Sequence, residues 1–161
     1  PVLLKKDIDL YLRRDPSQFS GLTGEEFMTE TSLLVCSPAF LRQHVNAQPG
    51  EIHQLPLVMT HSRPDLWLRW FQQSGKDINQ VQQRTVLDNT ILAIKATIEG
   101  LGIGLIPSLF IEDYLNTGTL LQLPQSMAIK TGSYSVLQPK AEHSQQSTWF
   151  RSWIHNIATP K

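Results

Sequence analysis

The chain has 161 residues, with 14 acidic and 14 basic side chains and a formal net charge of zero. This length suits one ordinary core or two small lobes, and the charge balance indicates neither a nucleic-acid surface nor an acidic tail. No apolar run approaches the roughly 18 residues that span a membrane, and no signal peptide is recognisable. The single cysteine excludes an internal disulfide and fits a reducing compartment, and a first residue other than Met indicates a fragment.

The N-terminal part predicts two strands and a short helix. Residues 8–12 and 31–36 form apolar strand patterns, and the turn residues of 15–26 predict a loop between them. Ser37 followed by Pro38 predicts the start of a helix, because serine caps helix N-termini and proline is tolerated at the first helical position.

The middle of the chain alternates strands with helices. Strands are predicted at 55–60, 81–87, 102–107 and 119–123, with a helix after each of the first three. Ser62, with Asp65 three residues later, resembles a capping box for the first helix. Its apolar stripe would be Leu66, Trp67, Trp70 and Phe71, and Gly75 would end it. This alternation implies a largely parallel sheet with helices on both faces.

The remaining helices are predicted from their caps and apolar spacing. Asp88 or Asn89 can cap the second helix, with an apolar face of Ile91, Ile94, Ile98 and Leu101. The third begins at Pro107 and ends near Gly118, with apolar residues Leu109, Ile111, Tyr114 and Leu115. After a strand at 134–139, a last helix from about Gln145 is expected to bury Trp149, Phe150, Trp153 and Ile157.

The stretch EGLGIGLIP contains glycines 100, 102 and 104 and suggests a nucleotide loop at first sight. A dinucleotide fingerprint runs from strand through glycines to helix, however, whereas these glycines follow a helix and precede a strand. They would lie at the negative end of the helix dipole, which repels phosphate. We interpret them as a helix stop followed by close packing.

No catalytic or metal motif can be assembled from the sequence. The histidines lack metal-ligand spacing, and Cys36 lies in an apolar strand, where a small core residue is expected. His61 follows a buried strand, but no base or nucleophile is placed beside it. We therefore predict no catalytic residues, no metal, no cofactor and no enzymatic activity.

Two polar segments follow predicted strands and are candidates for ligand binding. Thr60, His61, Ser62 and Arg63 come after one strand, and Asp88, Asn89 and Thr90 come after the next. In open α/β sheets, ligands bind outside the carboxyl ends of the strands, where helices present free N–H groups. Plain helix capping explains Ser62 and Asp88 equally well, so both interpretations stay open.

From Asp7 onward the chain resembles the effector-binding domain of LysR-type transcriptional regulators. DIDLYLRR resembles the family's strand ending in "DLAIR", and TSLLVCSPAFL resembles its "lvaSPayL" crossover. LWLRWFQQSG and LDNTILAIKATIEGLGIGLIP resemble "W.rWl...G" and "al..Aa.aGlGIallP". YLNTGTLLQL resembles "dlaaGrLv.l", and STWFRSWI resembles the final helix. The ordered series, rather than any one motif, carries the resemblance.

The resemblance implies an α/β fold of two Rossmann-like lobes of periplasmic-binding-protein type, joined by crossover strands near 33–36 and 133–136. Lobe I would comprise 1–33 and 133–161, and lobe II 34–132. Compared with the family pattern, the chain lacks the N-terminal winged helix-turn-helix and the first strand, helix and strand of lobe I. The first lobe is therefore expected to be incomplete.

The resemblance also implies a cytoplasmic bacterial sensor that binds a small effector, such as an amino acid or organic acid, in the cleft between lobes. By analogy, the ligand-binding residues would be Arg13, Thr60, His61, Ser62, Asp88, Asn89 and Thr90. The whole protein would be a homo-oligomer, a dimer or a tetramer, that binds DNA through its N-terminal domain and has no membrane segment. The alternative is a solute-binding protein of the same architecture.

Overall fold

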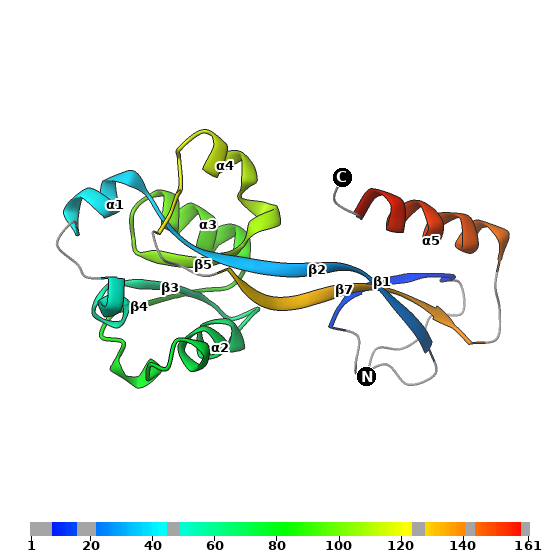
Figure 1. Cartoon of the computed structure of the whole chain (residues 1–161), viewed down its shortest axis with the longest axis horizontal. Helices are drawn as coiled ribbons and strands as arrows, with labels where there is room; N and C mark the ends of the chain where they lie inside the picture. Colours follow the sequence, from blue (N-terminus) through cyan, green and yellow to red (C-terminus); the bar gives the residue numbers. More distant parts are fainter. Residues whose placement is uncertain (1–7, 16–21, 45–48, 124–127, 141–143, 159–161) are drawn as a thin grey trace. The chain divides into compact units, whose positions relative to one another are not determined.

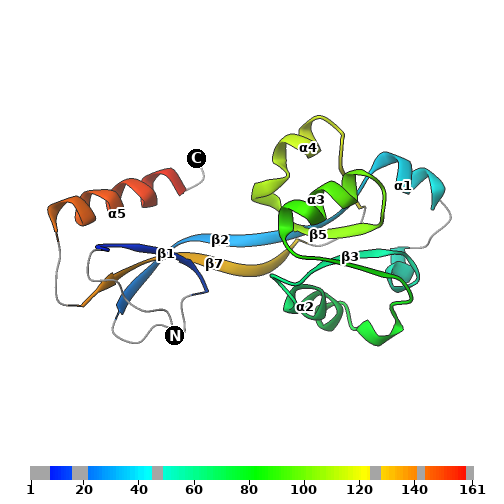
Figure 2. The same ribbon diagram turned by 180° about the vertical axis from the view of Figure 1, so that it is seen from behind.

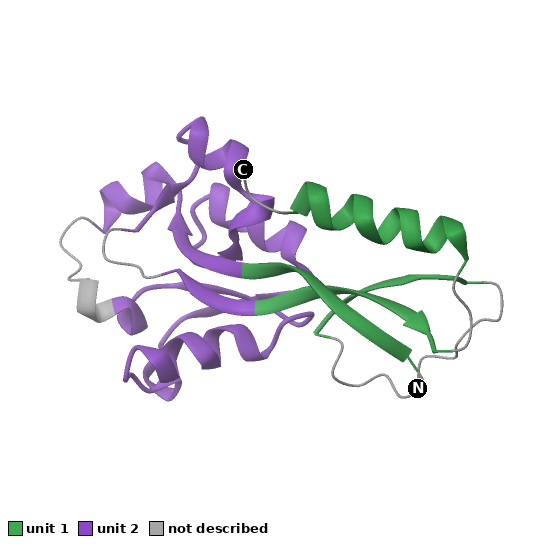
Figure 3. Ribbon diagram, turned by 45° about the vertical axis from the view of Figure 1, so that its right-hand side comes forward, with its two compact units in different colours: residues 1–30, 132–161 green, residues 31–131 purple. Residues whose placement is uncertain are grey.

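The computed structural model describes residues 8–15, 22–44, 49–123, 128–140 and 144–158. The chain divides into two compact units, unit 1 (1–30 and 132–161) and unit 2 (31–131), which Figure 3 shows in different colours. Two strands pass from one unit into the other: β2 (Leu22–Cys36) and β7 (Ile129–Pro139). The lobe boundaries implied by the sequence are 33/34 and 132/133.

The sheet of unit 2 is mixed. Strands β3 (Leu57–Thr60), β4 (Arg84–Leu87) and β5 (Ile103–Pro107) are parallel, as predicted. β2 departs from that prediction, because it runs antiparallel to both β5 and the two-residue β6 (Leu121–Gln122), and β6 therefore runs in the same direction as β5. The chain between β2 and β3 joins two strands that are not neighbours in the sheet, and such a connection does not require them to be parallel.

Helices cover both faces of this sheet, as the alternation predicted. α2 (Asp65–Gln73) lies on one face, and α3 (Thr90–Ile98) and α4 (Glu112–Asn116) lie on the other (Figures 1 and 2). Successive β2 residues point to opposite faces: Leu34 packs in the core with α2, and Val35 in the core with α3 and α4. Both side chains are fully buried, which stabilises the fold by about 1.5–3 kcal/mol each.

Two of the predicted helix caps are confirmed. α1 (Pro38–Gln43) begins after Ser37, whose hydroxyl accepts a hydrogen bond from the Phe40 N–H at 3.2 Å. Of the two alternatives at α3, Asn89 is the cap, and its side chain accepts from the Leu92 N–H at 3.1 Å.

The capping box predicted for α2 is wrong. The helix begins at Asp65 with Pro64 in the cap position, and no side chain caps it. Ser62 is held elsewhere, because its N–H donates to the Asp88 carbonyl at 3.2 Å and continues the pairing of β3 with β4. Asp65 instead forms an i,i+4 ion pair with Arg69 at 2.7 Å.

The glycines of EGLGIGLIP form a helix stop, as predicted. Gly100 has φ +81°, its N–H donates to the Thr97 carbonyl, and the Leu101 N–H donates to the Ala96 carbonyl. These two bonds define a Schellman motif. A Cβ on Gly102 would lie 2.5 Å from the Pro56 carbonyl oxygen. The backbone just before β5 therefore lies in close contact with the backbone just before β3.

Several predicted boundaries shift in the structure. β1 (Tyr11–Arg14) begins three residues after the predicted start, and β2 begins at Leu22, inside the predicted loop. The predicted strand 81–87 shortens to β4, after a 3₁₀ turn at Ile78–Gln80. Further 3₁₀ turns occupy Pro49–Gln54 and Ser108–Phe110, the latter replacing the start of the third predicted helix. The predicted strands 119–123 and 134–139 become the short β6 and the longer β7.

The expected burial of the helix faces is wrong in part. In α5 (Gln145–Ala158), Trp149, Trp153 and Ile157 are exposed, and the buried residues are Ser147 and Ile154. In and after α3, Ile91 and Leu101 are exposed, and so are Leu109 and Tyr114 beyond β5. α3 instead buries Ala93, Ile94, Ala96 and Thr97. The small residues allow the helix to approach the sheet closely, which a count of large apolar residues does not reveal.

In unit 1, β1 pairs antiparallel with β7, from Tyr11 opposite Leu137 to Arg14 opposite Tyr134. The buried carboxylate of Glu30 on β2 accepts hydrogen bonds from the Arg14 guanidinium at 3.1 Å and from the Tyr134 hydroxyl at 2.8 Å. These partners satisfy a charge that would otherwise be costly to bury.

Gly102→Ala tests the close strand entry. We expect it to lower the free energy of unfolding by about 1–3 kcal/mol, since the added methyl group meets backbone that cannot rotate away. Gly118→Ala is the control: it also forces an alanine into positive φ but meets no atom within 4 Å, and it should cost about 1 kcal/mol. Urea unfolding followed by tryptophan fluorescence measures both, and an equal or smaller loss at Gly102 would contradict the packing.

Candidate functional site

The two polar segments predicted after β3 and β4 are joined by backbone hydrogen bonds. The His61 N–H donates to the Leu87 carbonyl at 2.8 Å, and the Ser62 N–H donates to the Asp88 carbonyl at 3.2 Å. The parallel register of β3 and β4 places Thr60 opposite Leu87, so the pairing simply runs on past the strand ends. The side-by-side placement of these segments follows from that register.

A small cavity of about 10 Å³ lies at the carboxyl ends of β3 and β5, within unit 2. Thr60 and Thr90 both line it, which brings one predicted residue from each polar segment together. The other lining residues are Val58, Met59, Arg63, Leu66, Trp67, Ala93, Leu105, Ile106 and Pro107. This volume is about that of one water molecule, so a larger ligand requires the rim to open.

The indole of Trp67 forms one wall of the cavity and is fixed by a buried hydrogen bond. Its Nε1–H donates to the Val58 carbonyl at 2.8 Å, and the ring packs against Trp70 and Phe71. An apolar wall held in one orientation beside two threonines is the usual composition of a small-molecule pocket.

Among the described residues that line the cavity, the one charged side chain is that of Arg63. Arg63 lines the cavity, and α3 begins beside it at Thr90. Asn89 satisfies the Leu92 N–H, but the first N–H groups of an α-helix have no partner within the helix and carry the positive end of its dipole. A guanidinium and a helix N-terminus together favour a carboxylate or another small anion.

The seven predicted residues are therefore placed differently. Thr60 and Thr90 line the cavity, and Asn89 is the helix cap beside it. His61, Ser62 and Asp88 are exposed on the joined segments. Arg13 belongs to β1 in unit 1, where its guanidinium donates to the Leu12 carbonyl at 3.1 Å and lies over the Tyr11 ring.

Two further cavity residues bear on ligand binding: Arg63, which belongs to the predicted polar segment but not to the seven predicted ligand-binding residues, and Trp67, which is predicted only as part of a helix stripe. Arg63 carries a usable signal, because it is the one cation in the polar segment after a buried strand. Trp67 appears in the sequence as part of an apolar helical stripe, and nothing in that spacing distinguishes a cavity wall from the core.

The described residues do not meet the requirements of a metal site or of a nucleophilic cysteine. Within the described ranges, no three His, Cys, Asp or Glu side chains come together as metal ligands, and no helix there is long and apolar enough to cross a membrane. Cys36 is fully buried, and this burial raises the pKa of its thiol from the usual 9.0 to about 11. A thiol that stays protonated is a poor nucleophile, as expected for a core residue.

Comparison with known proteins identifies the family. The family model for the LysR substrate binding domain matches residues 2–158. The chain belongs to this family. Among curated proteins, this LysR substrate-binding domain is 27% identical over 155 residues to the glycine cleavage system transcriptional activator homolog of Haemophilus influenzae, covering 96% of this chain and 51% of that protein. It is 25% identical over 153 residues to the glycine cleavage system transcriptional activator of Escherichia coli K12, covering 94% and 50%.

Solved structures with the same fold include effector domains. The domain matches the effector domain of the transcriptional regulator AmpR of Pseudomonas aeruginosa with a TM-score of 0.75 and 22% identity, covering 94% of this chain and 71% of that one. The AmpR effector binding domain from Citrobacter freundii matches with a TM-score of 0.77 and 20% identity, covering 94% and 74%. The two-lobe, periplasmic-binding-protein-like α/β architecture is thereby confirmed, and the chain spans about half the length of the curated relatives it matches.

The buried thiol predicts a pH dependence of stability. Well below pH 9 the Cys36 thiol is protonated in both the folded and the unfolded chain, so its contribution to stability is fully present. As the pH rises from about 9 to 11, only the unfolded chain releases the proton, and stability falls. Urea unfolding across this range should show a steeper loss for the native sequence than for Cys36→Ala. If the free energies of unfolding of the two proteins fall in parallel as the pH rises, the raised pKa of the buried thiol is contradicted.

Proposed function

We propose that this domain senses a small-molecule effector for a LysR-type DNA-binding transcriptional regulator. The family match and the regulators among its relatives support this role over that of a solute-binding protein. The proposal assigns binding rather than catalysis to the domain, with no cofactor. Units 1 and 2 would be the two lobes of the effector-binding domain, the first one incomplete.

The observation that carries the proposal is the cavity at the carboxyl ends of β3 and β5. Thr60 and Thr90 supply hydroxyls, Arg63 supplies a positive charge, and Trp67 supplies an apolar wall. This set suits a small carboxylate with a short apolar or polar body, such as an amino acid or an organic acid. Asn89, His61, Ser62 and Asp88 would contact the ligand from the rim.

The wider assignments follow from the same proposal. The whole protein would act in the cytoplasm as a homo-oligomer and contact DNA through a winged helix-turn-helix outside this domain. Effector binding would then shift the balance between two states of the assembly, which requires only that one state bind the effector more tightly.

Thermal unfolding of the domain against a panel of small acids tests the proposal. The panel should contain glycine, since two relatives are named for the glycine cleavage system, together with other amino acids and with aromatic and aliphatic acids. At about one hundred times its Kd, a ligand adds about 2.7 kcal/mol of stability and raises the midpoint. The corresponding amide of an active acid should have a much smaller effect, because it lacks the charge. No shift from any class would contradict an effector site in this domain.

A paired substitution then tests the residues. Thr60→Val with Thr90→Val keeps the side-chain shape but removes both hydroxyls, and we expect the affinity for the identified acid to fall about tenfold or more. Thr148→Val, an exposed threonine on α5, is the matched control and should leave affinity unchanged. Undiminished binding by the paired variant in calorimetry would refute this placement of the ligand.

A further inference from the structure

The residues that line the cavity at the carboxyl ends of β3 and β5 divide into a polar rim and an apolar wall. The polar side chains, Thr60, Arg63 and Thr90, are all partly exposed. The described lining residues that are buried are all apolar, among them Trp67 from α2 and Ala93 from α3. An acid bound here would hold its carboxylate at the rim and direct the rest of the molecule toward the wall.

The side chain of Trp67 is held in place on the α2 side of the wall. Its indole N–H donates to the Val58 carbonyl at 2.8 Å, and its ring centroid lies 5.9 Å from that of Trp70 and 6.0 Å from that of Phe71. The rings of Trp70 and Phe71 are in edge contact with each other at 5.1 Å, and all three side chains are buried. Turning the indole away would break a buried hydrogen bond and disrupt a close-packed cluster, and both changes are costly.

The wall on the α3 side is fixed as well. The Thr97 hydroxyl donates to the Ala93 carbonyl at 2.8 Å, and a Cβ on Gly104 would lie 2.6 Å from that hydroxyl, so this turn of α3 is in close contact with β5. At the rim, by contrast, Met59 and Arg63 are partly exposed side chains with flexible stems, which can turn outward. The cavity can therefore widen at its rim, but the wall behind the rim cannot retreat.

We propose that Trp67 limits the effector to a small acid, with a body of about one or two carbon atoms beyond the carboxylate. This inference rests on the proposed effector-sensing function and adds a size limit to it. The closed cavity has a volume of about 10 Å³, which is about that of one water molecule, and only its rim can widen. A longer body presses against a wall that does not move, and one additional methylene group in such a pocket changes affinity roughly 10–200-fold.

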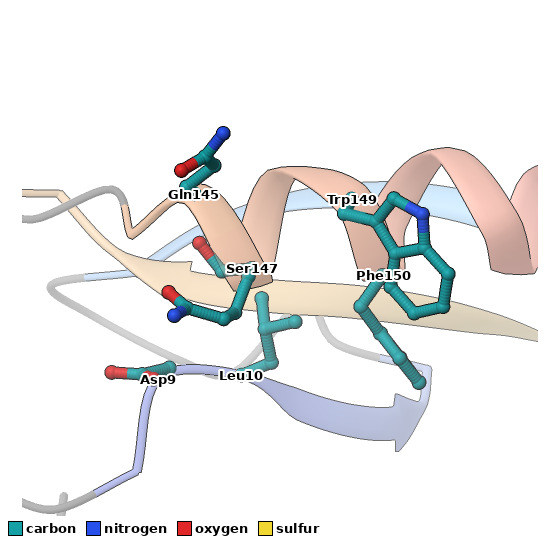
Figure 4. Close-up of a pocket in the computed structure, with 7 residues that line it drawn as sticks. Asp9, Leu10, Gln145, Ser147, Trp149 and Phe150 are labelled. Atoms are coloured by element: carbon teal, nitrogen blue, oxygen red, sulfur yellow. The ribbon is translucent and has the colours of Figure 1, made fainter.

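A larger groove in unit 1 does not suit an acid. It has a volume of about 560 Å³ and lies between the segment before β1 and the first turns of α5. Leu10 rises toward the helix, and the ring of Phe150 points from the helix toward that segment, with Trp149 beside it (Figure 4). Among the described residues that line this groove, the one charged side chain is the carboxylate of Asp9, which repels another carboxylate. Trp149 therefore provides a control tryptophan that borders a different hollow.

Calorimetric titration of the domain with two homologous series tests the size limit. One series is acetate, propionate, butyrate and valerate, and the other is glycine, alanine, α-aminobutyrate and norvaline. For the native sequence, the affinity should fall about tenfold or more between the second and the fourth member of the series that binds. Trp67→Phe should bind the fourth member more tightly than the native domain does, because the smaller ring leaves room for the longer body. A variant that is merely destabilised would instead bind every member less tightly and to the same degree.

Two matched controls separate the cavity wall from the aromatic cluster and from the groove. Trp70→Phe changes a buried tryptophan of the same cluster that does not line the cavity, and Trp149→Phe changes the tryptophan of the groove. Both variants should keep the selectivity of the native domain. The same gain of affinity for long acids in either control would overturn the role assigned to Trp67.

A second variant widens the cavity from the opposite side and keeps the test decisive if Trp67→Phe folds poorly. Ala93→Gly removes the methyl group that α3 contributes to the wall and should also favour the longer acids. Ala96→Gly brings the same loss of helix propensity at a position that does not line the cavity, and it should leave the selectivity unchanged. Identical selectivity in the two glycine variants would contradict the wall.

The outcomes distinguish the size limit from the effector proposal on which it rests. If the native domain binds short and long acids equally well, or if the wider panel of acids yields only large ligands, the effector site stands and the size limit is wrong. If no acid of any size binds the domain, the effector proposal itself fails and the size limit fails with it.

Discussion

The antiparallel pairing of β2 with β5 is the constraint on which unit 2 depends. It places Leu33 opposite Ile106 and Val35 opposite Gly104, so the buried C-terminal end of β2 lies against β5, in which every residue is buried. β5 in turn pairs with β3, and β3 with β4. The position of every strand end that borders the cavity is therefore set by this pairing.

The glycines after α3 make this arrangement possible. A side chain at Gly104 would lie 2.6 Å from the Thr97 hydroxyl, and one at Gly102 would meet the backbone at Pro56. Without these side chains, α3 lies close to β5, and its first residue, Thr90, reaches the cavity that Thr60 also lines. The glycine segment does not bind the ligand, but it positions the opposite end of the helix that is proposed to do so.

Local sequence patterns predicted the fold well where one side-chain atom or one backbone angle decides where a helix begins or ends. Ser37 and Asn89 cap helices because short polar side chains reach the N–H three residues on, and Gly100 ends α3 because glycine accepts positive φ. The patterns failed where the outcome depends on distant partners. β2 begins at Leu22 because β7 lies beside it in the sheet and pairs with it. Residues 15–26 are rich in turn-forming residues, and their sequence does not indicate that a distant strand pairs with them.

In the candidate site, too, the sequence predicted the residues whose position follows from local structure and missed those whose position depends on packing. Thr60 and Thr90 could be proposed from their places after strands, since parallel strands end at one edge of a sheet. Arg63 and Trp67 complete the cavity but depend on how α2 packs, which its apolar stripe leaves open. For α5 the stripe pointed to burial, yet Trp149 and Trp153 are exposed, because periodicity shows that a helix has an apolar face and not what packs against it.

The central claim is that an acidic effector binds at the carboxyl ends of β3 and β5. Chemical-shift mapping of backbone amides, with the acid that gives the largest thermal shift, tests it most directly. We predict the largest changes at Thr60–Arg63 and at Asn89–Ile91, together with the Trp67 indole N–H. Changes concentrated along α5 or along the edge of β4, with these amides unmoved, would contradict the account.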